Sequence, residues 1–351
     1  MSLRRRDFKL SFTLFEDSMT LSRPRLGARR DVLRTLLATG ASALAFPTWA
    51  ADAYPSRPIT WVVPYPTGGF GDALSRSLAQ KLSESLKVPV IVDNRPGAGG
   101  QIGVSYAKQQ PADGYTLLYG DIGPFSMNAA LYAKLPYDMQ RDFSPVARLL
   151  TSPSLLVVSA SSPIKSLDDL IKAAKTEKGV TYGSYGVGSA PHIFGAMLQR
   201  EAGGRFEHAA YKGAAPALQD LIGGHIDVMC DVIASSAPMV RDGKLRALAV
   251  VGVDQRAALL PQVPTLGELG HGSLNLLGWT GVVVRSGTPR PIVDRLNVEL
   301  VKALKSPDIV ARYTELGLDI SPQSPEQFGQ FMQAEAKRWA QVIQAANIQV
   351  D

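Results

Sequence analysis

The 351-residue sequence contains one cysteine and four histidines. A single cysteine excludes an internal disulfide and a cysteine-rich metal site, and the apolar run around Cys230 predicts a buried, unreactive thiol. The histidines form no i,i+4 pair and no H-E-x-x-H sequence, so we predict no metal site. The sequence also lacks a Walker A motif and a G-x-S-x-G elbow, and we therefore expect neither a cofactor nor a catalytic constellation.

The first 53 residues read as an export leader. Arg29 and Arg30 precede the apolar run 36–46, and Ala51-Asp52-Ala53 follows as an A-x-A cleavage pattern, so we expect removal near Ala53. The apolar run is shorter than the about 20 residues that span a bilayer, which favours a removable leader over a membrane anchor. The arginine pair fits a twin-arginine signal and equally well an ordinary signal with a charged start. The predicted location is the periplasm.

Charge does not point to nucleic acid. The chain has a net charge of +6, but residues 1–53 hold nine Lys/Arg against five Asp/Glu. The remaining chain is therefore close to neutral, and it shows no basic stripe with interleaved aromatic residues. We expect no nucleic-acid partner.

From residue 59 onward, short β-rich runs alternate with helical segments in two series. The first has strands over 59–65, 88–94 and 116–120, with helices over 72–86 and 100–109 between them. The second has strands over 155–160, 180–185, 207–211, 226–232 and 246–252, and a last strand over 279–284 precedes the C-terminal helices. This spacing is typical of βαβ units and predicts parallel sheets covered by helices. Two series without a linker predict two lobes joined by crossing strands, with a cleft between them.

Glycine-rich turns follow strands in both series. The turn 67–72 opens a helix, and backbone N–H groups at a helix start lack partners inside the helix, so the turn suits an anion. Similar turns occur over 120–128, 184–192 and 211–216, and Asp231 ends another strand. Each turn alone is equally explained as a plain connector, and Asp72 as a capping carboxylate. Together they predict one anion-binding cleft.

Several sequence blocks, in this order, resemble the Bug family of periplasmic solute receptors, the TctC-like binding proteins of tripartite tricarboxylate transport systems. They include P-Y-P-T-G-G-F-G-D (64–72), V-D-N-R-P-G-A-G-G-Q-I-G (92–103), P-A-D-G-Y-T-L-L (111–118) and Y-K-G-A-A-P-A-L-Q-D-L-I-G-G-H-I-D (211–227). The resemblance runs from Tyr54 to the C-terminus.

The resemblance implies an α/β Venus-flytrap fold of the type II-like periplasmic binding protein kind, with two doubly wound lobes around a ligand cleft. We expect lobe 1 to comprise residues 54–154 and 285–351, and lobe 2 residues 155–284. It further implies a receptor without enzymatic activity, which captures a small carboxylate (organic acid, aromatic carboxylate or amino acid) by lobe closure. A membrane transporter, or alternatively a sensor protein, would be its partner.

Carried over by position, the resemblance implicates residues of both lobes in ligand binding. In the first lobe these are Thr67, Gly68, Gly69 and Asp72, together with Asp121, Ile122 and Phe125 of the following turn. In the second lobe they are Ser184, Gly188, Ser189, His192, Tyr211, Lys212 and Gly213. Asp231 falls where an acid of the family meets a ligand's amino group.

The sequence departs from the family pattern at Tyr185 and Val187, which are bulkier and less polar than usual, and apolar Ile122 and Phe125 occur in the opposite turn. These changes favour a carboxylate with an apolar or aromatic body over a small acidic amino acid. The competing hypothesis is a secreted α/β enzyme, such as a hydrolase, that uses Ser189 or Asp72 with His192 in the same cleft.

Overall fold

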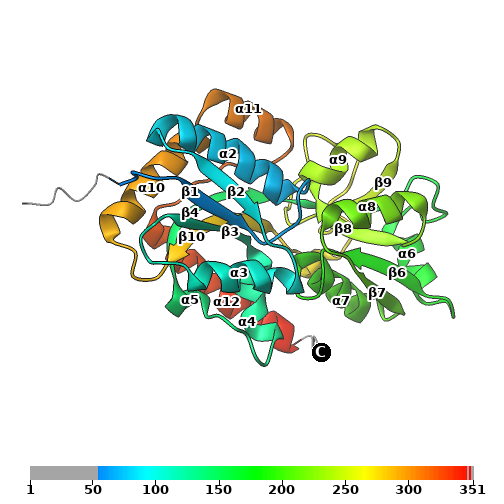
Figure 1. Ribbon diagram of the computed structural model, residues 1–351. Coiled ribbons are helices and arrows are strands. Elements are labelled where there is room, and N and C mark those ends of the chain that lie inside the picture. Colours follow the sequence, from blue (N-terminus) through cyan, green and yellow to red (C-terminus); the bar gives the residue numbers. More distant parts are fainter. Residues whose placement is uncertain (1–53, 346–347, 349–351) are drawn as a thin grey trace, which may run out of the picture. The chain divides into compact units, whose positions relative to one another are not determined.

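The computed structural model describes residues 54–345 and residue 348, so the predicted leader over 1–53 lies outside the described residues. The first of two sheets has the strand order β2-β1-β3-β10-β4 (Figure 1). Its strands are β1 (Ile59–Val63), β2 (Val90–Asn94), β3 (Thr116–Asp121), β4 (Phe143–Ser152) and β10 (Gly278–Arg285). The second sheet has the order β7-β6-β8-β5-β9. Its strands are β5 (Ser154–Ser159), β6 (Val180–Ser184), β7 (Phe206–Ala210), β8 (Val228–Val232) and β9 (Leu245–Val251).

Each sheet is mixed, whereas the sequence pattern predicted parallel sheets. In the first, β1 is parallel to β2 and β3, while β10 runs antiparallel to β3 and β4. In the second, β6 is parallel to β7 and β8, while β5 runs antiparallel to β8 and β9. In each sheet the antiparallel strand is the one by which the chain enters that lobe: β10 in the first sheet and β5 in the second. Such a strand arrives from the other lobe and not through a helical crossover, so it can run against its neighbours.

The chain crosses between the lobes twice, as predicted. Pro153 alone separates β4 from β5, and the connection 252–277 leads from β9 back to β10. The predicted boundary between residues 284 and 285 would put most of β10 in the second lobe. Its pairing with β3 and β4 instead assigns β10 to the first sheet. The hydrogen-bonded register, which local sequence patterns do not reveal, decides the membership of a crossing strand.

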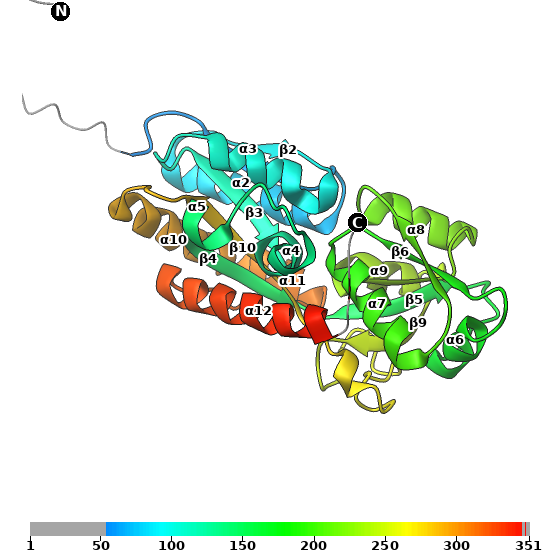
Figure 2. The ribbon, with the colours of Figure 1, turned by 90° about the horizontal axis from the view of Figure 1, so that it is seen from below.

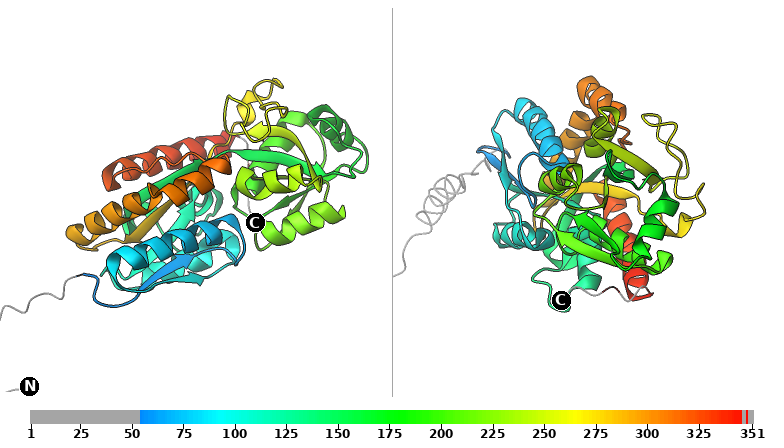
Figure 3. Two further views of the ribbon diagram at one scale, coloured as in Figure 1. Left: turned by 90° about the horizontal axis from the view of Figure 1, so that it is seen from above. Right: turned by 90° about the vertical axis from the view of Figure 1, so that its right-hand side faces the viewer.

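Helices cover both faces of each sheet (Figures 2 and 3). In the first lobe α2, α10 and α11 lie on one face, and α3, α4, α5 and α12 on the other; in the second lobe α8 and α9 lie opposite α6 and α7. Their bounds are α2 (Phe70–Leu86), α3 (Gln101–Gln109), α4 (Asn128–Leu131), α5 (Met139–Asp142), α6 (Leu167–Ala174), α7 (Ala190–Ala202), α8 (Ala214–Gly223), α9 (Ile233–Arg241), α10 (Arg290–Leu304), α11 (Pro307–Glu315) and α12 (Pro325–Ala345). Short helical turns are η1 (Ala98–Gly100), η2 (Gly123–Met127) and η3 (Gly272–Leu274).

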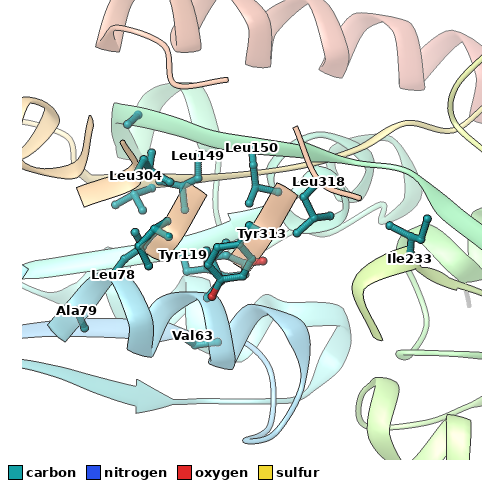
Figure 4. Close-up of a cluster of buried hydrophobic side chains, with 14 of the residues drawn as sticks. Val63, Leu78, Ala79, Tyr119, Leu149, Leu150, Ile233, Leu304, Tyr313 and Leu318 are labelled. Atoms are coloured by element: carbon teal, nitrogen blue, oxygen red, sulfur yellow. The ribbon is translucent and has the colours of Figure 1, made fainter. Parts of the chain in front are cut away.

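The hydrophobic core consists of two clusters, one on each side of the sheets, and each includes residues of both lobes. Figure 4 shows part of the first cluster, where Leu78 of α2 lies near Tyr119 of β3 and Tyr313 of α11, and Ile233 of α9 lies on the second-lobe side. The apolar positions of α2 repeat at Leu74, Leu78, Leu82 and Leu86, and all four are buried. This spacing places them on one helical face.

The start of α12 follows from a local sequence signal, whereas strand β4 does not. Ser324 caps α12 reciprocally, because its Oγ accepts from the Gln327 N–H and the Gln327 Oε1 accepts from the Ser324 N–H. Strand β4, in contrast, was not predicted, since Pro145 lies inside it. β4 lies at the edge of its sheet, where a strand tolerates a residue that lacks an N–H donor.

Helix α12 attaches to the crossing strand through one buried carboxylate. Glu335 Oε2 accepts hydrogen bonds from the indole Nε1 of Trp279 (3.0 Å) and of Trp339 (3.1 Å). Both indoles are buried, so water cannot replace the carboxylate as acceptor. Trp279 also packs edge-on against Phe328 and Phe331 of α12.

We predict that Glu335→Ala lowers the free energy of unfolding by about 2–5 kcal/mol, because it leaves two buried N–H donors without an acceptor. Chemical denaturation measures the change. Gln333→Ala, at an exposed position of the same helix, is the control and should change stability by less than about 0.5 kcal/mol. Equal losses in the two variants would contradict the anchoring role of Glu335.

Candidate functional site

A cavity lies between the two sheets, and the starts of four helices reach it. Its lining includes the first residues of α2, α7, α8 and α9: Phe70, Gly71, Ala190, Pro191, Ala214, Ala215 and Ser235. None of these helices has a side-chain hydrogen bond from its N-cap within the described part of the chain. At the start of α9 the Ile233 N–H donates to the Pro153 carbonyl (3.0 Å), and Pro191 of α7 and Pro216 of α8 have no N–H. The other N–H groups of these first turns have no capping side chain and can bind a ligand, and the four helix dipoles add partial positive charge.

The cavity lining carries little formal charge. Among the described residues that line it, Asp121 has the only ionisable carboxyl group, and Lys, Arg and His are not represented. Any positive potential in the cavity must therefore come from backbone amides and helix starts. This composition suits an anion held by many weak donors and not by one ion pair.

Aromatic and apolar side chains form most of the cavity wall. They are Tyr65, Phe70, Tyr119, Ile122, Tyr185, Leu276 and Trp279. Sequence reasoning identified Ile122 and Tyr185 and missed the others. Tyr119 lies in β3 and Trp279 in β10, where a buried aromatic residue looks like ordinary core. The one sequence signal for Tyr119 was that it lies two residues before Asp121, a predicted site residue, and Trp279 had no such signal.

Tyr185 covers Asp231. The phenol hydroxyl donates to Asp231 Oδ1 (2.5 Å) and accepts from the Val232 N–H (3.2 Å). Asp231 is fully buried, and burial raises the pKa of its carboxyl group to about 7 although the Tyr185 hydrogen bond opposes the shift. Tyr185 lines the cavity and Asp231 does not. The tyrosine therefore stands between the carboxyl group and any ligand.

The first lobe repeats this pairing at Tyr65 and Asp121. Strands β1 and β3 pair Val62 with Leu118, and the same register carried past the strand ends places Tyr65 opposite Asp121. Strands β6 and β8 pair Gly183 with Met229, which likewise places Tyr185 opposite Asp231. Burial raises the pKa of Asp121 to about 6, while the Tyr65 hydroxyl and the Gly123 N–H oppose the shift. Each lobe thus contributes a tyrosine–aspartate pair at the same position of its sheet.

The predicted residues of the first turn divide into two groups. Thr67 and Gly69 line the cavity, whereas Gly68 and Asp72 do not. Asp72 instead accepts from the Gly68 N–H (3.0 Å) and from Asn94 Nδ2 (3.0 Å), and it pairs with Arg76. Burial opposes ionisation, but these three donors together lower its pKa. Asp72 therefore stabilises the turn 67–72 through hydrogen bonds and does not line the cavity.

Ser189 and His192 do not form a catalytic pair. The Ser189 hydroxyl donates to the Gly186 carbonyl (2.6 Å), and His192 Nδ1 accepts from the Gly188 N–H (3.3 Å). His192 stacks on His208, and burial together with this neighbour lowers the pKa of His192 to about 4.

A serine–histidine contact does occur nearby, between Ser184 Oγ and His208 Nε2 (2.6 Å). Ser184 is fully buried, and neither residue is among those that line the cavity. The serine also donates to the Gly186 carbonyl and accepts from the Gly186 N–H. Because a substrate in the cavity would not meet this hydroxyl, the contact supports the turn 184–189.

The other predicted residues surround the cavity without lining it, except Gly213, which does line it. Phe125 is buried against Trp279, with ring centroids 6.3 Å apart. The Tyr211 hydroxyl donates to Asp220 (2.7 Å), and Lys212 is exposed. Val187 and Gly188 face the first lobe away from the cavity, near Tyr132.

A comparison with protein-family models matches residues 74–348 to the tripartite tricarboxylate transporter family receptor. The chain belongs to this family. Its relatives include protein BugT of Bordetella pertussis, which is 36% identical over 84% of this chain and 90% of BugT. The resemblance noted in the sequence is thereby confirmed.

Two solved structures of similar proteins contain carboxylates. MatC from Rhodopseudomonas palustris, solved with bound malate, is 32% identical with a TM-score of 0.79 and covers 83% of this chain and 100% of that chain. A second R. palustris protein, solved with adipate, is 34% identical with a TM-score of 0.80 and covers 85% of this chain and 100% of that chain. The two-lobed periplasmic binding protein fold is therefore confirmed for this receptor.

The described residues offer neither a metal site nor a membrane-spanning helix. Over 54–345, we find no cluster of three or more His, Cys, Asp or Glu side chains placed to hold a metal ion. The helices in the described part of the chain are also too short or too polar to cross a membrane.

Ionisation of Asp231 gives a testable pH dependence. Between about pH 4 and pH 7 the folded protein keeps a proton that the unfolded chain releases, so the free energy of unfolding falls as pH rises through this window. Asp231→Asn cannot ionise and retains an acceptor for Tyr185. We predict that the variant gains about 2 kcal/mol relative to wild type when pH rises from about 5 to about 8, because one pKa unit corresponds to about 1.4 kcal/mol.

Denaturant unfolding at the two pH values measures this difference. The lowered pKa values of His192 and His208 produce the opposite trend below about pH 6. Both proteins share these histidines, so their effect cancels in the comparison. A stability difference that does not change with pH would contradict the assignment of a raised pKa to Asp231.

Proposed function

We propose that the protein is a periplasmic receptor that binds a small carboxylate with an apolar body between its two lobes. The observation that carries this proposal is the convergence of four uncapped helix starts on one cavity whose described lining contains no basic side chain. Backbone donors at helix starts favour anions. The malate and adipate bound by similar receptors support a carboxylate as the anion.

The residues of the cavity wall support an apolar body for the ligand. Tyr119, Tyr185 and Trp279 offer apolar surface to the body of a ligand. An ammonium group would need an acceptor of negative charge. Tyr185 occupies Oδ1 of Asp231, and Asp121, which lines the cavity, already accepts from the Gly123 N–H (2.9 Å) and from the Tyr65 hydroxyl. The ligand is therefore a carboxylate without an amino group, such as a linear dicarboxylate or an aromatic acid.

Capture proceeds by lobe closure. The helix starts of α2 belong to one lobe and those of α7, α8 and α9 to the other, so all of them surround a ligand only when the lobes meet. A ligand that touches both lobes shifts the population toward the closed state. The receptor then presents the ligand to a membrane transporter of the tripartite tricarboxylate kind, without chemical change. The hydrolase alternative is disfavoured by the separate hydrogen-bond partners of Ser189, His192 and Asp72.

Calorimetry against adipate, malate, benzoate and aspartate tests the proposal, with NMR analysis of each compound after incubation. We predict saturable binding of at least one amine-free carboxylate and recovery of the unchanged compound. The diamide of adipic acid, which has the same length and no charge, should not bind. Turnover of a bound compound, or equal binding of acid and diamide, would contradict the receptor.

A charge placed at one helix start tests the anion site directly. Ala215→Asp introduces a carboxylate at the start of α8, where it lines the cavity and competes with the ligand for the same N–H groups. We predict an affinity loss of at least about tenfold, or about 1.4 kcal/mol. Gln219→Asp, one turn later at an exposed position of the same helix, is the matched control and should bind as wild type does.

Tyr185→Ala tests the predicted selectivity. The substitution removes the ring that covers Asp231, so an amino group can reach the carboxylate. We predict that the affinity for aspartate relative to adipate rises at least about tenfold in calorimetry, the gain of one charge-assisted contact. The double variant Tyr185→Ala/Asp231→Asn should lose this gain. A gain that persists in the double variant would show that pocket size, and not Asp231, governs the preference.

A further inference from the structure

The two lobes touch at a second place, outside the cavity. Tyr132, which follows α4 in the first lobe, donates a hydrogen bond from its hydroxyl to the carbonyl oxygen of Val187 in the second lobe (3.0 Å). Val187 lies in the turn between β6 and α7. Neither residue is among those that line the cavity. The contact therefore joins the two lobes directly and does not involve a ligand in the cavity.

Glycines permit the close approach at this contact. A Cβ atom on Gly99 would lie 2.3 Å from the Val187 carbonyl oxygen, and one on Gly188 would lie 2.8 Å from Asn128 Oδ1 and 2.9 Å from the Tyr132 hydroxyl. All three distances are shorter than a real Cβ atom tolerates. Gly99 and Gly188 also adopt positive φ angles of +59° and +84°, which favour glycine.

Both sides of the contact are held by hydrogen bonds within their own lobe. Asn128, which is fully buried, donates to the Gly99 carbonyl (3.2 Å) and to the Tyr137 hydroxyl (3.0 Å). Tyr137 in turn donates to the Pro124 carbonyl (3.0 Å). In the second lobe, the Ser189 hydroxyl fixes the turn that carries Val187. Two preformed surfaces therefore meet, so little ordering is needed when they come together.

We propose that Tyr132, Gly99 and Asn128 of the first lobe and the Val187–Gly188 segment of the second form a closure seam, which sets the equilibrium of lobe closure without contacting the ligand. The proposal rests on the proposed function, since closure matters only to a receptor that encloses its ligand. Tyr132 is then a positioning residue. The apparent affinity of such a receptor scales with the fraction of molecules able to close, so weakening the seam weakens binding to an unaltered pocket.

Tyr132→Phe tests the hydrogen bond. We expect the affinity for adipate, or for the tightest-binding carboxylate of the panel above, to fall about two- to tenfold, the range for one net hydrogen bond. The loss should come mainly from faster dissociation, because the seam forms after ligand entry. Tyr54→Phe is the matched control: it removes a tyrosine hydroxyl that donates to a backbone carbonyl, that of Gly114 (2.7 Å), within the first lobe. Its affinity should equal that of wild type.

Gly99→Ala tests the close approach. The methyl group would collide with the Val187 carbonyl, so the lobes cannot meet fully, and we expect a loss of affinity of at least about tenfold together with a smaller closed fraction. Gly203→Ala is the control for backbone strain. Gly203 has nearly the same φ angle (+64°) at the end of α7, and a Cβ atom there meets nothing within 4 Å. It should lose stability and retain affinity.

Double electron–electron resonance between two spin labels, with and without adipate, measures the separation of the lobes. The labels are attached at Gln109→Cys in the first lobe and at Glu207→Cys in the second, and both positions are exposed. The native Cys230 is buried but lines the cavity, so the labelled proteins also carry Cys230→Ser. A shift of Tyr132→Phe and Gly99→Ala toward longer distances, absent in both controls, supports the seam even if the wild type binds no carboxylate of the panel. Seam variants that match their controls in affinity and distance overturn it, as does a wild type whose lobes stay apart in every condition.

Discussion

The site depends on backbone dipoles gathered at one edge of each sheet. Parallel strands all end at the same edge, and each is followed by a helix whose first N–H groups have no internal partner. β1, β6, β7 and β8 lead in this way into α2, α7, α8 and α9. The crossing strands complete the arrangement, since β4 ends and β5 and β10 begin beside the same cavity at Ser152, Ser154 and Gly278. The anion binding that we propose is thus a consequence of topology, and it needs no basic side chain.

Because backbone groups supply the donors for an anion, the cavity wall can be apolar. A lysine or arginine in the wall would fix one carboxylate strongly but would also need counter-charges and water around it. Backbone donors leave the side chains free to set shape. The tyrosine–aspartate pair of the second lobe extends the same principle, because the Tyr185 hydroxyl covers the buried Asp231, whereas Asp121 of the first lobe lines the cavity together with Tyr65. Burial raises the pKa of Asp231 to about 7, which reduces its negative charge and so its repulsion of an anion near neutral pH.

The sequence allowed much of the fold to be predicted, and less of the site. Alternating strands and helices, and the helix start that follows Thr67–Gly69, are local patterns, and the structure has them. The same local pattern could not separate a ligand-facing Asp72 from a capping one, because both require a carboxylate at the helix start. The position of Tyr185 over Asp231 depends on the register between β6 and β8, which joins residues 46 apart. Trp279 likewise becomes a wall residue only through strand pairing.

The anchoring of Trp279 connects the cavity to the C-terminal helix. Its indole lines the cavity on one side and donates to Glu335 on the other, while Phe328 and Phe331 hold the ring between strand and helix. Trp279 lies on β10, where the chain has just returned to the first lobe. A wall that is fixed to the first lobe gives the second-lobe turns a rigid surface against which to close. In the closure that we propose, the second lobe brings Tyr185 against this wall, and we infer that selectivity depends on the second-lobe side while the wall keeps its shape.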